Sequence, residues 1–191
     1  MKTLKQVVTP NSSVMTLTIK IDWAHLWMAG RGEATIDWGD GTSQTMTLTR
    51  EGDDYVREYY AISKYTIIIT GEVTELECLH MNLIALDISR NSSLKELHCD
   101  YNNLIRLDVS QNAALVNLSC CENRLTVLKV SQNNALNSIN CGYCRLSVDA
   151  LNDLFRCLPD NGGKITIDGN GGYFECDVSI LTAKGWEVEP W

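Results

Sequence analysis

The sequence is short of basic residues. Its 191 residues include 16 Lys and Arg against 24 Asp and Glu, which gives a formal net charge of −8 at pH 7. Nucleic-acid binding requires clustered Lys and Arg to neutralise phosphates, and binding to an anionic membrane surface requires the same. No segment approaches the apolar length that spans a bilayer. We therefore expect no nucleic-acid partner and no membrane insertion by this chain.

The sequence also lacks the short motifs of common catalytic sites. It contains no Gly-x-Ser-x-Gly, no His-Glu-x-x-His and no phosphate-binding loop. Cys141-Gly-Tyr-Cys144 matches a thiol oxidoreductase motif by letter, but that chemistry needs a helix N-terminus behind the cysteine to lower its pKa. We expect a protein that is not an enzyme and that uses no cofactor and no metal.

The most regular feature of the sequence is a repeat with a step of 21 residues. Four cysteines share the step, namely Cys78, Cys99, Cys120 and Cys141. Such a period predicts a solenoid whose units bury their apolar faces on one another. The cysteines would then form an inward column of small apolar side chains, with poor geometry for disulfides between parallel neighbours. We expect these thiols to be reduced, while the spacing of Cys157 and Cys176 leaves their pairing open.

Asparagines share the same step. Asn102 and Asn123 each follow a predicted strand, and we expect them to form a ladder that satisfies backbone groups at the turn. Met81 and Cys144 stand in this column at the two ends of the repeat, where repeats are usually irregular.

The residues before the repeat predict short β-strands. Val14–Ile21 and Ala34–Trp38 alternate apolar and polar residues, and Tyr55–Tyr60 and Tyr65–Thr70 supply further strands. Gly39-Asp40-Gly41 is a turn signal, so turn chemistry is the interpretation we favour for Asp37 and Asp40, with a cation site as the alternative.

The last strand of this first module already follows the step of the repeat. Ile62 and Ile67 stand 21 residues before Leu83 and Ile88. We therefore expect a small sandwich that is fused to the repeat as its N-terminal cap, which a solenoid needs to cover its first edge.

The segment after Leu146 changes character. Residues 148–158 have helical apolar spacing, with Ser147 as the N-cap and Pro159 as the stop. Ile165-Thr-Ile167 restores the strand pattern, 176–184 predicts a second short helix, and 186–188 predicts a closing strand. These elements predict a C-terminal cap.

Two motifs resemble known families. The pattern L-x-x-L-x-C-x-x-N-x-L resembles a short bacterial leucine-rich repeat, and Ile-Asp-Trp-Gly-Asp-Gly-Thr at 36–42 resembles PKD-like β-sandwich modules. With Lys-Gly-Trp at 184–186, the whole chain is similar to secreted leucine-rich repeat proteins of Bacteroides-type gut bacteria. This resemblance implies a β-rich fold with a minor helical part: a right-handed solenoid with a parallel concave sheet over 73–191, a sandwich cap over 1–72 and a helix-containing cap from about 147. It also implies a secreted or cell-surface location, a signal segment missing from the N-terminus, and a binding role.

We expect the ligand to bind the concave face of the predicted solenoid. The candidate residues are the outward columns of the strands and the tyrosines of the rim: Glu75, Glu77, Glu96, His98, Asp100, Tyr101, Asn117, Ser119, Cys121, Asn140, Tyr143, Thr166 and Asp168. Four of these, Glu77, His98, Asp100 and Cys121, are also a conceivable metal cluster, but we favour a solvated polar face.

The acidic rows of this face suit a basic protein partner, and tyrosine is a common anchor in interfaces. The main hypothesis is therefore a protein-binding or adhesion module, in which replacing Glu77, Glu96 and Asp100 by Lys weakens binding without unfolding the repeats. The alternative is carbohydrate binding through the rim tyrosines or through Trp23, Trp27 and Trp38 of the first module.

Overall fold

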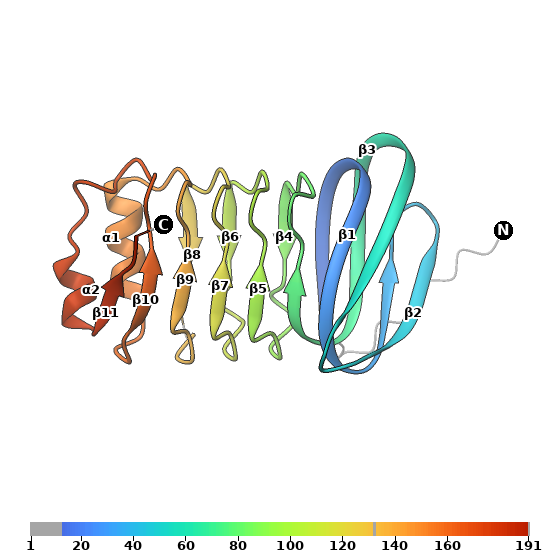
Figure 1. Ribbon diagram of the computed structural model, residues 1–191, viewed down its shortest axis with the longest axis horizontal. Helices are drawn as coiled ribbons and strands as arrows, with labels where there is room; N and C mark the ends of the chain where they lie inside the picture. The colour runs from blue at the N-terminus through green and yellow to red at the C-terminus, as the bar shows by residue number, and fades with distance from the viewer. Residues whose placement is uncertain (1–12, 132, 191) are drawn as a thin grey trace.

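The computed structural model describes residues 13–131 and 133–190. Its elements in chain order are β1 (Val14–Asp37), β2 (Ser43–Leu48), β3 (Asp53–Glu77), β4 (Ala85–Asp87), β5 (Glu96–His98), β6 (Arg106–Asp108), β7 (Asn117–Ser119), β8 (Val127–Lys129), β9 (Ser138–Asn140), α1 (Val148–Cys157), β10 (Gly163–Thr166), α2 (Ser179–Ala183) and β11 (Trp186–Val188). A mixed sheet of nine strands runs in the order β11-β10-β9-β7-β5-β3-β1-β2, with β4 also paired to β1 (Figure 1). Strands β6 and β8 form a second sheet of two strands.

The fold class predicted from the sequence is wrong. The described residues do not form a leucine-rich repeat solenoid behind a separate sandwich, because the long strands β1 and β3 belong to the same mixed sheet as the short parallel strands. Strand β3 pairs with β1 in antiparallel fashion and, at its C-terminal end, with β5 in parallel fashion. Hydrogen bonding therefore passes without a break from the antiparallel part into the parallel part.

Strands β1 and β3 join segments that the sequence predicts as separate strands. Val14–Ile21 pairs with Ser63–Thr70, and its alternation is confirmed by the burial of Met15, Leu17 and Ile19. The later part of β1 pairs with the C-terminal end of β3, for example Met28 opposite Leu76. Figure 1 shows both strands as tall bent ribbons at one end of the molecule.

The 21-residue step extends back into β3 only in part. Ile67 and Ile88, which are one step apart, are both fully buried as predicted. Ile62 is 70% exposed, whereas Leu83, one step later, is fully buried. The strand that pairs with β4 is β1, through Leu17 opposite Leu86, and the pairing is antiparallel. The step therefore includes Ile67 and Leu76 of β3 but not Ile62.

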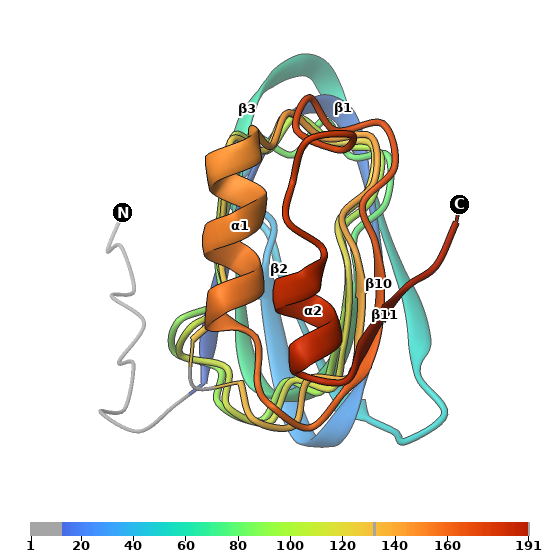
Figure 2. The ribbon, with the colours of Figure 1, turned by 90° about the vertical axis from the view of Figure 1, so that its left-hand side faces the viewer.

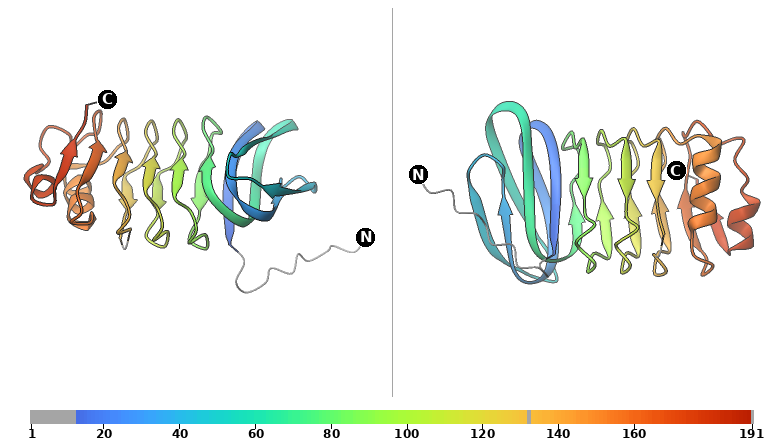
Figure 3. Two further views of the ribbon diagram at one scale, coloured as in Figure 1. Left: turned by 60° about the horizontal axis from the view of Figure 1, so that its bottom comes forward. Right: turned by 180° about the vertical axis from the view of Figure 1, so that it is seen from behind.

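In that later part, the strands pair in parallel with a register of one step. Leu76, Leu97, Leu118 and Ile139 lie opposite one another on β3, β5, β7 and β9. Figure 2, viewed along the stack, shows these strands on one side and α1 on the other. Figures 1 and 3 show a nearly straight stack, so the face that the sequence predicts as concave is flat.

The predicted asparagine ladder is confirmed. Asn102 accepts the backbone N–H groups of Met81 and Leu83 and donates to carbonyls that include that of Cys78. Asn123 repeats the arrangement one step later. A second ladder lies on the opposite side of each repeat, where Asn91, Asn112 and Asn133 are buried and each donates to carbonyls of the preceding repeat.

The cysteine column is buried as predicted. Cys78, Cys99, Cys120 and Cys141 are fully buried with free thiols, and burial raises the pKa of each. Cys157 and Cys176 are also free thiols in this structure. Cys144, in the asparagine column, is buried next to the ladder and donates its S–H to the carbonyl of Cys120.

The helix predicted after Leu146 is confirmed as α1. The Ser147 side chain caps it by accepting the N–H of Ala150. The second helix, α2, is shorter than the predicted 176–184, and β11 closes the sheet beside β10. No helix among the described residues is long and apolar enough to span a membrane.

Candidate functional site

The structure brings eight of the predicted site residues together in two rows. We call this surface the outward face; it comprises Glu75, Glu77, Glu96, His98, Asn117, Ser119, Asn140 and Thr166. All of them are partly exposed. Side chains in register on parallel strands are lateral neighbours, spaced by roughly 4.8 Å. The outward face is therefore a polar strip whose acidic residues lie at the junction with β3.

Two glutamates of like charge lie opposite each other on the outward face. Glu75 on β3 pairs in register with Glu96 on β5. Burial and, next, the charge of Glu96 raise the pKa of Glu75. Asn117 donates to one oxygen of Glu96 at 3.2 Å, and the His98 ring lies 3.8 Å from the other. Like charges placed directly opposite on neighbouring strands destabilise a sheet, and the charges of Lys95 and His98 offset the rise in the pKa of Glu75 only in part.

Two predicted site residues do not belong to the surface. Asp100 is 8% exposed and Cys121 is 2% exposed. The Asp100 carboxylate turns along the stack and accepts the hydroxyl of Ser119 and the backbone N–H of Cys121, each at 2.7 Å. Burial and the hydrogen bond to Asp100 raise the pKa of the Cys121 thiol. Asp100 therefore holds successive repeats together, and replacing it by Lys would disrupt them, contrary to the prediction.

The predicted rim tyrosines lie in a column with unusual backbone geometry. His80, Tyr101, Glu122 and Tyr143 all have φ between 51° and 57°, and Gly169 continues the column at 71°. This left-handed conformation is uncommon outside glycine. Tyr101 and Tyr143 are each 43% exposed, as predicted for the rim. The His80 ring stacks on that of Tyr101 with centroids 4.4 Å apart, a contact that the sequence pattern does not predict.

The last predicted residue, Asp168, lies at the C-terminal end of the stack. It is half-buried, and its carbonyl accepts the N–H of Tyr143. The Asp168 side chain also hydrogen-bonds Tyr173 and raises the pKa of that phenol. Asp168 is thus held by hydrogen bonds to its neighbours, and it lies far along the sequence from the acidic pair on β3 and β5.

A small pocket adjoins the acidic end of the outward face. It has a volume of about 90 Å³ and is lined by His25, Trp27, Asp54, Glu77 and Leu79. Trp27 lies opposite both Asp54 and Glu77 because β3 meets β1 twice. His25 and Asp54 form a hydrogen bond of 2.6 Å between Nε2 and Oδ1. The pocket combines an indole with two carboxylates.

The sequence could not have indicated this pocket as a unit. Trp27 and Glu77 are 50 residues apart, and their pairing depends on irregularities in the register of β1 around Trp27 and Met28. The one local signal is Gly52, whose α-carbon lies against the Trp27 ring so closely that a Cβ would be 2.1 Å from it. Only glycine fits there.

Asp37 and Asp40, the alternative cation site, have a structural role. Asp37 and Asp40 accept backbone N–H groups within their own hairpin turn, and Arg57 also donates to Asp40. Of the three tryptophans predicted to stack on sugars, Trp38 is 3% exposed and Trp23 is 37% exposed. In the part of the chain that the structure describes, no three His, Cys, Asp or Glu side chains are grouped so that they could hold a metal ion.

Comparisons with protein-family models, with curated proteins and with solved structures found no match to this chain. The chemical properties of the site are therefore inferred from its own residues. Carboxylates in register, an indole and partly exposed amides provide ionic, cation–π and hydrogen-bonding contacts to a cationic group.

Proposed function

We propose that this protein is a non-enzymatic binding module and that the acidic end of its outward face binds a basic segment of a partner protein. The opposed glutamates, Glu75 and Glu96, carry the proposal. Their repulsion costs stability in the free protein, and a cationic side chain placed between them would relieve it. A secreted or cell-surface location belongs to the proposal through the sequence resemblance alone.

The pocket beside the outward face supplies an anchor for such a segment. An Arg or Lys side chain entering it would meet the carboxylates of Glu77 and Asp54 and the ring of Trp27. Cation–π contacts contribute about 0.5–2 kcal/mol depending on desolvation, and an arginine adds paired hydrogen bonds to a carboxylate. Glu77 of the pocket lies two residues after Glu75 at the end of β3, so one extended segment can occupy both the pocket and the glutamate pair.

The test compares two triple variants of equal charge. Glu75→Gln, Glu77→Gln and Glu96→Gln are combined in the first, and Glu51→Gln, Glu58→Gln and Glu175→Gln, all exposed elsewhere, are combined in the control. The probe is a fluorescent peptide of alternating Arg and Thr, titrated by anisotropy at physiological salt. We expect the first variant to lose at least tenfold in affinity and the control less than twofold. Equal losses would reduce the effect to net charge and contradict the proposal.

A second candidate function is binding of a carbohydrate. It is favoured by the half-exposed rings of Tyr101 and Tyr143, which lie two steps apart in one column, since sugars often stack on aromatic faces. Glycan-array binding that is lost in Tyr101→Ala with Tyr143→Ala, but kept in the triple glutamine variant, would support this function over peptide binding.

A further inference from the structure

The nine-stranded sheet ends in β11 on one side and in β2 on the other. Figure 1 shows these two edge strands at opposite ends of the molecule. An uncovered edge strand is a template for pairing with another chain, and soluble proteins usually protect it with charged residues, proline, a bulge, a short length or a covering element. The protection at each edge therefore indicates whether that edge is suited to association.

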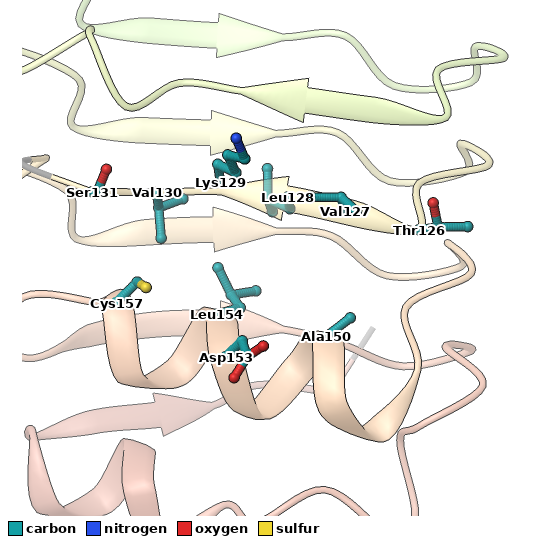
Figure 4. A pocket seen from close by; sticks show the side chains of 10 residues that line it. All are labelled: Thr126, Val127, Leu128, Lys129, Val130, Ser131, Ala150, Asp153, Leu154 and Cys157. Carbon is teal, nitrogen blue, oxygen red and sulfur yellow. The ribbon is translucent and has the colours of Figure 1, made fainter.

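Two other edges of the molecule are protected. Strand β11 is only three residues long, it contains Glu187, and Glu189 follows it. In the two-stranded sheet, α1 packs directly beside β8. Leu128 of β8 and Leu154 of α1 are 7% and 2% exposed, and Figure 4 shows Leu154 pointing from the helix toward the strand. Neither edge is suited to pairing with a further strand.

The edge at β2 has none of these protections. Its six residues, Ser-Gln-Thr-Met-Thr-Leu at 43–48, include no charged residue and no proline. It pairs with β1 in unbroken register along its whole length, so no bulge interrupts it. Among the described residues, β1 is the only strand that pairs with β2, and Ser43, Thr45 and Thr47 are exposed. The strand is therefore long, regular and uncharged, which is what association through an edge requires.

The pairing with β1 determines which backbone groups of β2 face outward. The N–H of Trp38 donates to the carbonyl of Thr42 at 3.0 Å, so these two residues form a hydrogen-bonded pair of the ladder. In an antiparallel ladder, such pairs recur at every second residue, and Gln44 therefore also bonds to β1. The residues between these pairs turn their N–H and C=O groups away from β1, namely Ser43, Thr45 and Thr47. Among the described residues, these outward groups have no hydrogen-bond partner.

We propose that two copies of this chain associate through β2, with the two strands paired in antiparallel fashion about a two-fold axis at Thr45. A two-fold axis brings the same surface of both copies together, and an antiparallel strand pair has this symmetry. Thr45 then lies opposite its own counterpart, and Ser43 lies opposite the partner subunit's Thr47. In this register all three outward residues exchange both of their hydrogen bonds, whereas a shift along the strand leaves outward groups unpaired.

The side chains brought together by this register suit a contact between identical copies. Pairs of threonine and serine on neighbouring strands stabilise a sheet, and β2 has no charged residue that the axis could place opposite itself. Asp40 and Arg50 each stand five residues from Thr45, on opposite sides. The axis therefore directs Arg50 toward the partner subunit's Asp40, a residue of opposite charge.

The same pairing covers apolar surface at the end of the sheet. Met46 lies on the inner face of β2, where it packs against the buried core but stays partly exposed. In the proposed register it lies opposite the partner subunit's Gln44, and the methylene groups of that side chain cover it. The contact is distinct from the acidic end of the outward face and does not depend on the function proposed for it.

The test is sedimentation velocity of the full chain from low micromolar to several hundred micromolar concentration. We expect a reversible dimer of twice the chain mass of 21.3 kDa. Thr45→Lys places two like charges directly opposite each other at the axis, which should weaken dimerisation at least tenfold. The matched control is Thr66→Lys, at an exposed position of β3 opposite Thr18, and it should change the dissociation constant less than twofold. Circular dichroism of both variants establishes that they fold.

A mixture of two charge variants tests the register itself. Thr45→Glu should weaken dimerisation as Thr45→Lys does, but an equimolar mixture of the two should restore the dimer, because opposite charges then meet at the axis. A wild type that stays monomeric, a dimer that is indifferent to Thr45→Lys, growth beyond a dimer, or a mixture that fails to associate would each overturn the proposal. A monomeric wild type that binds an end-blocked peptide of residues 43–48 would also overturn it, in favour of a strand from another protein.

Discussion

The two halves of the molecule hold their backbones in place by different means. In the first, β1 and β3 have 24 and 25 residues, and alternating apolar side chains such as Leu17 and Ile69 bury one face of their long antiparallel ladder. In the second, most parallel strands have only three residues. Three residues cannot fix a register by apolar alternation alone, so buried asparagines take over that role.

This difference places the candidate site. Where the two systems meet, Glu75 belongs to the long ladder and Glu96 to the first short strand. The long ladder fixes the register of Glu75, and the asparagine ladder fixes that of Glu96. Together they keep the two carboxylates opposite each other despite their repulsion. The acidic end of the outward face is thus a consequence of the junction.

The largest expected effect comes from breaking the asparagine ladder of the second half. Asn123 accepts the N–H of Leu104 and donates to the carbonyls of Cys99, Cys120 and Cys121. Asn123→Ala leaves the buried N–H of Leu104 unpaired and removes one donor from each of the three carbonyls, so we expect a loss of about 3 kcal/mol in the free energy of unfolding. Chemical denaturation monitored by circular dichroism measures it.

The opposite ladder provides a graded control. Asn133 donates to two carbonyls, and its side-chain oxygen has no partner among the described residues. We expect Asn133→Ala to cost about 2 kcal/mol, because fewer backbone groups lose a partner. If Asn133→Ala costs as much as Asn123→Ala or more, the packing volume of the asparagine side chains, and not their hydrogen bonds, would maintain the register of the strands in this half.

In the first half, a single buried hydrogen bond should contribute less. Tyr59 donates to the carbonyl of Trp38 at 2.9 Å and stacks on Tyr65. Tyr59→Phe keeps the ring and removes the donor, so we expect a loss of about 1 kcal/mol. Burial, then the charge of Asp40, raises the pKa of Tyr59 from 10.0 to about 12.

The same residue predicts an alkaline dependence. Because the pKa of Tyr59 is raised in the folded protein, the protonated phenol contributes to stability below pH 10. The folded protein loses this contribution as the pH rises toward about 12. The stability difference between wild type and Tyr59→Phe should therefore shrink over that interval. A difference that stays constant through it would indicate that the phenol does not ionise with unfolding.

An effect of similar or smaller size is expected at the hairpin turn between β1 and β2. Burial opposes the ionisation of Asp40, but hydrogen bonds from Thr42 and Arg57 outweigh it and lower the pKa below 3.8. Asp40→Asn should cost up to about 1 kcal/mol at neutral pH. The stability that it removes is present above pH 3.8 and is lost as the pH falls below that value, so wild type and variant should converge in acid.

The repeat made much of the second half predictable. A step shared by Cys78, Asn102 and Leu104 requires equivalent environments in each unit, and their burial confirms it. Ser147 and Pro159 fixed the ends of α1 for reasons local to the chain. These predictions hold because each depends on periodicity or on neighbours within a few residues.

The predictions that were wrong depended on contacts distant in sequence. The extent of β1 and β3 follows from pairing with each other, and polar residues such as Ser63 and Lys64, which looked like a break, lie within the ladder. Asp100 occupies an outward column in the pattern, yet its carboxylate reaches Cys121 in the next repeat and is buried. Alternation assigns a face to a residue but does not determine where its side chain turns.

The smallest expected effect tests the junction between β3 and β5 most directly, and it is an increase in stability. Glu75→Gln removes the repulsion with Glu96 and should raise the free energy of unfolding by about 0.5 kcal/mol at pH 7. The pKa of Glu75 is raised above 4.5, so its carboxylate becomes protonated in the folded wild type as the pH falls toward 4.5, and the repulsion disappears. The stability advantage of Glu75→Gln over wild type should therefore vanish below pH 4.5. Glu51→Gln, an exposed turn residue, is the control. A loss of stability in Glu75→Gln would mean that the two carboxylates are not in conflict, and the proposed cationic ligand would then lack its main physical reason.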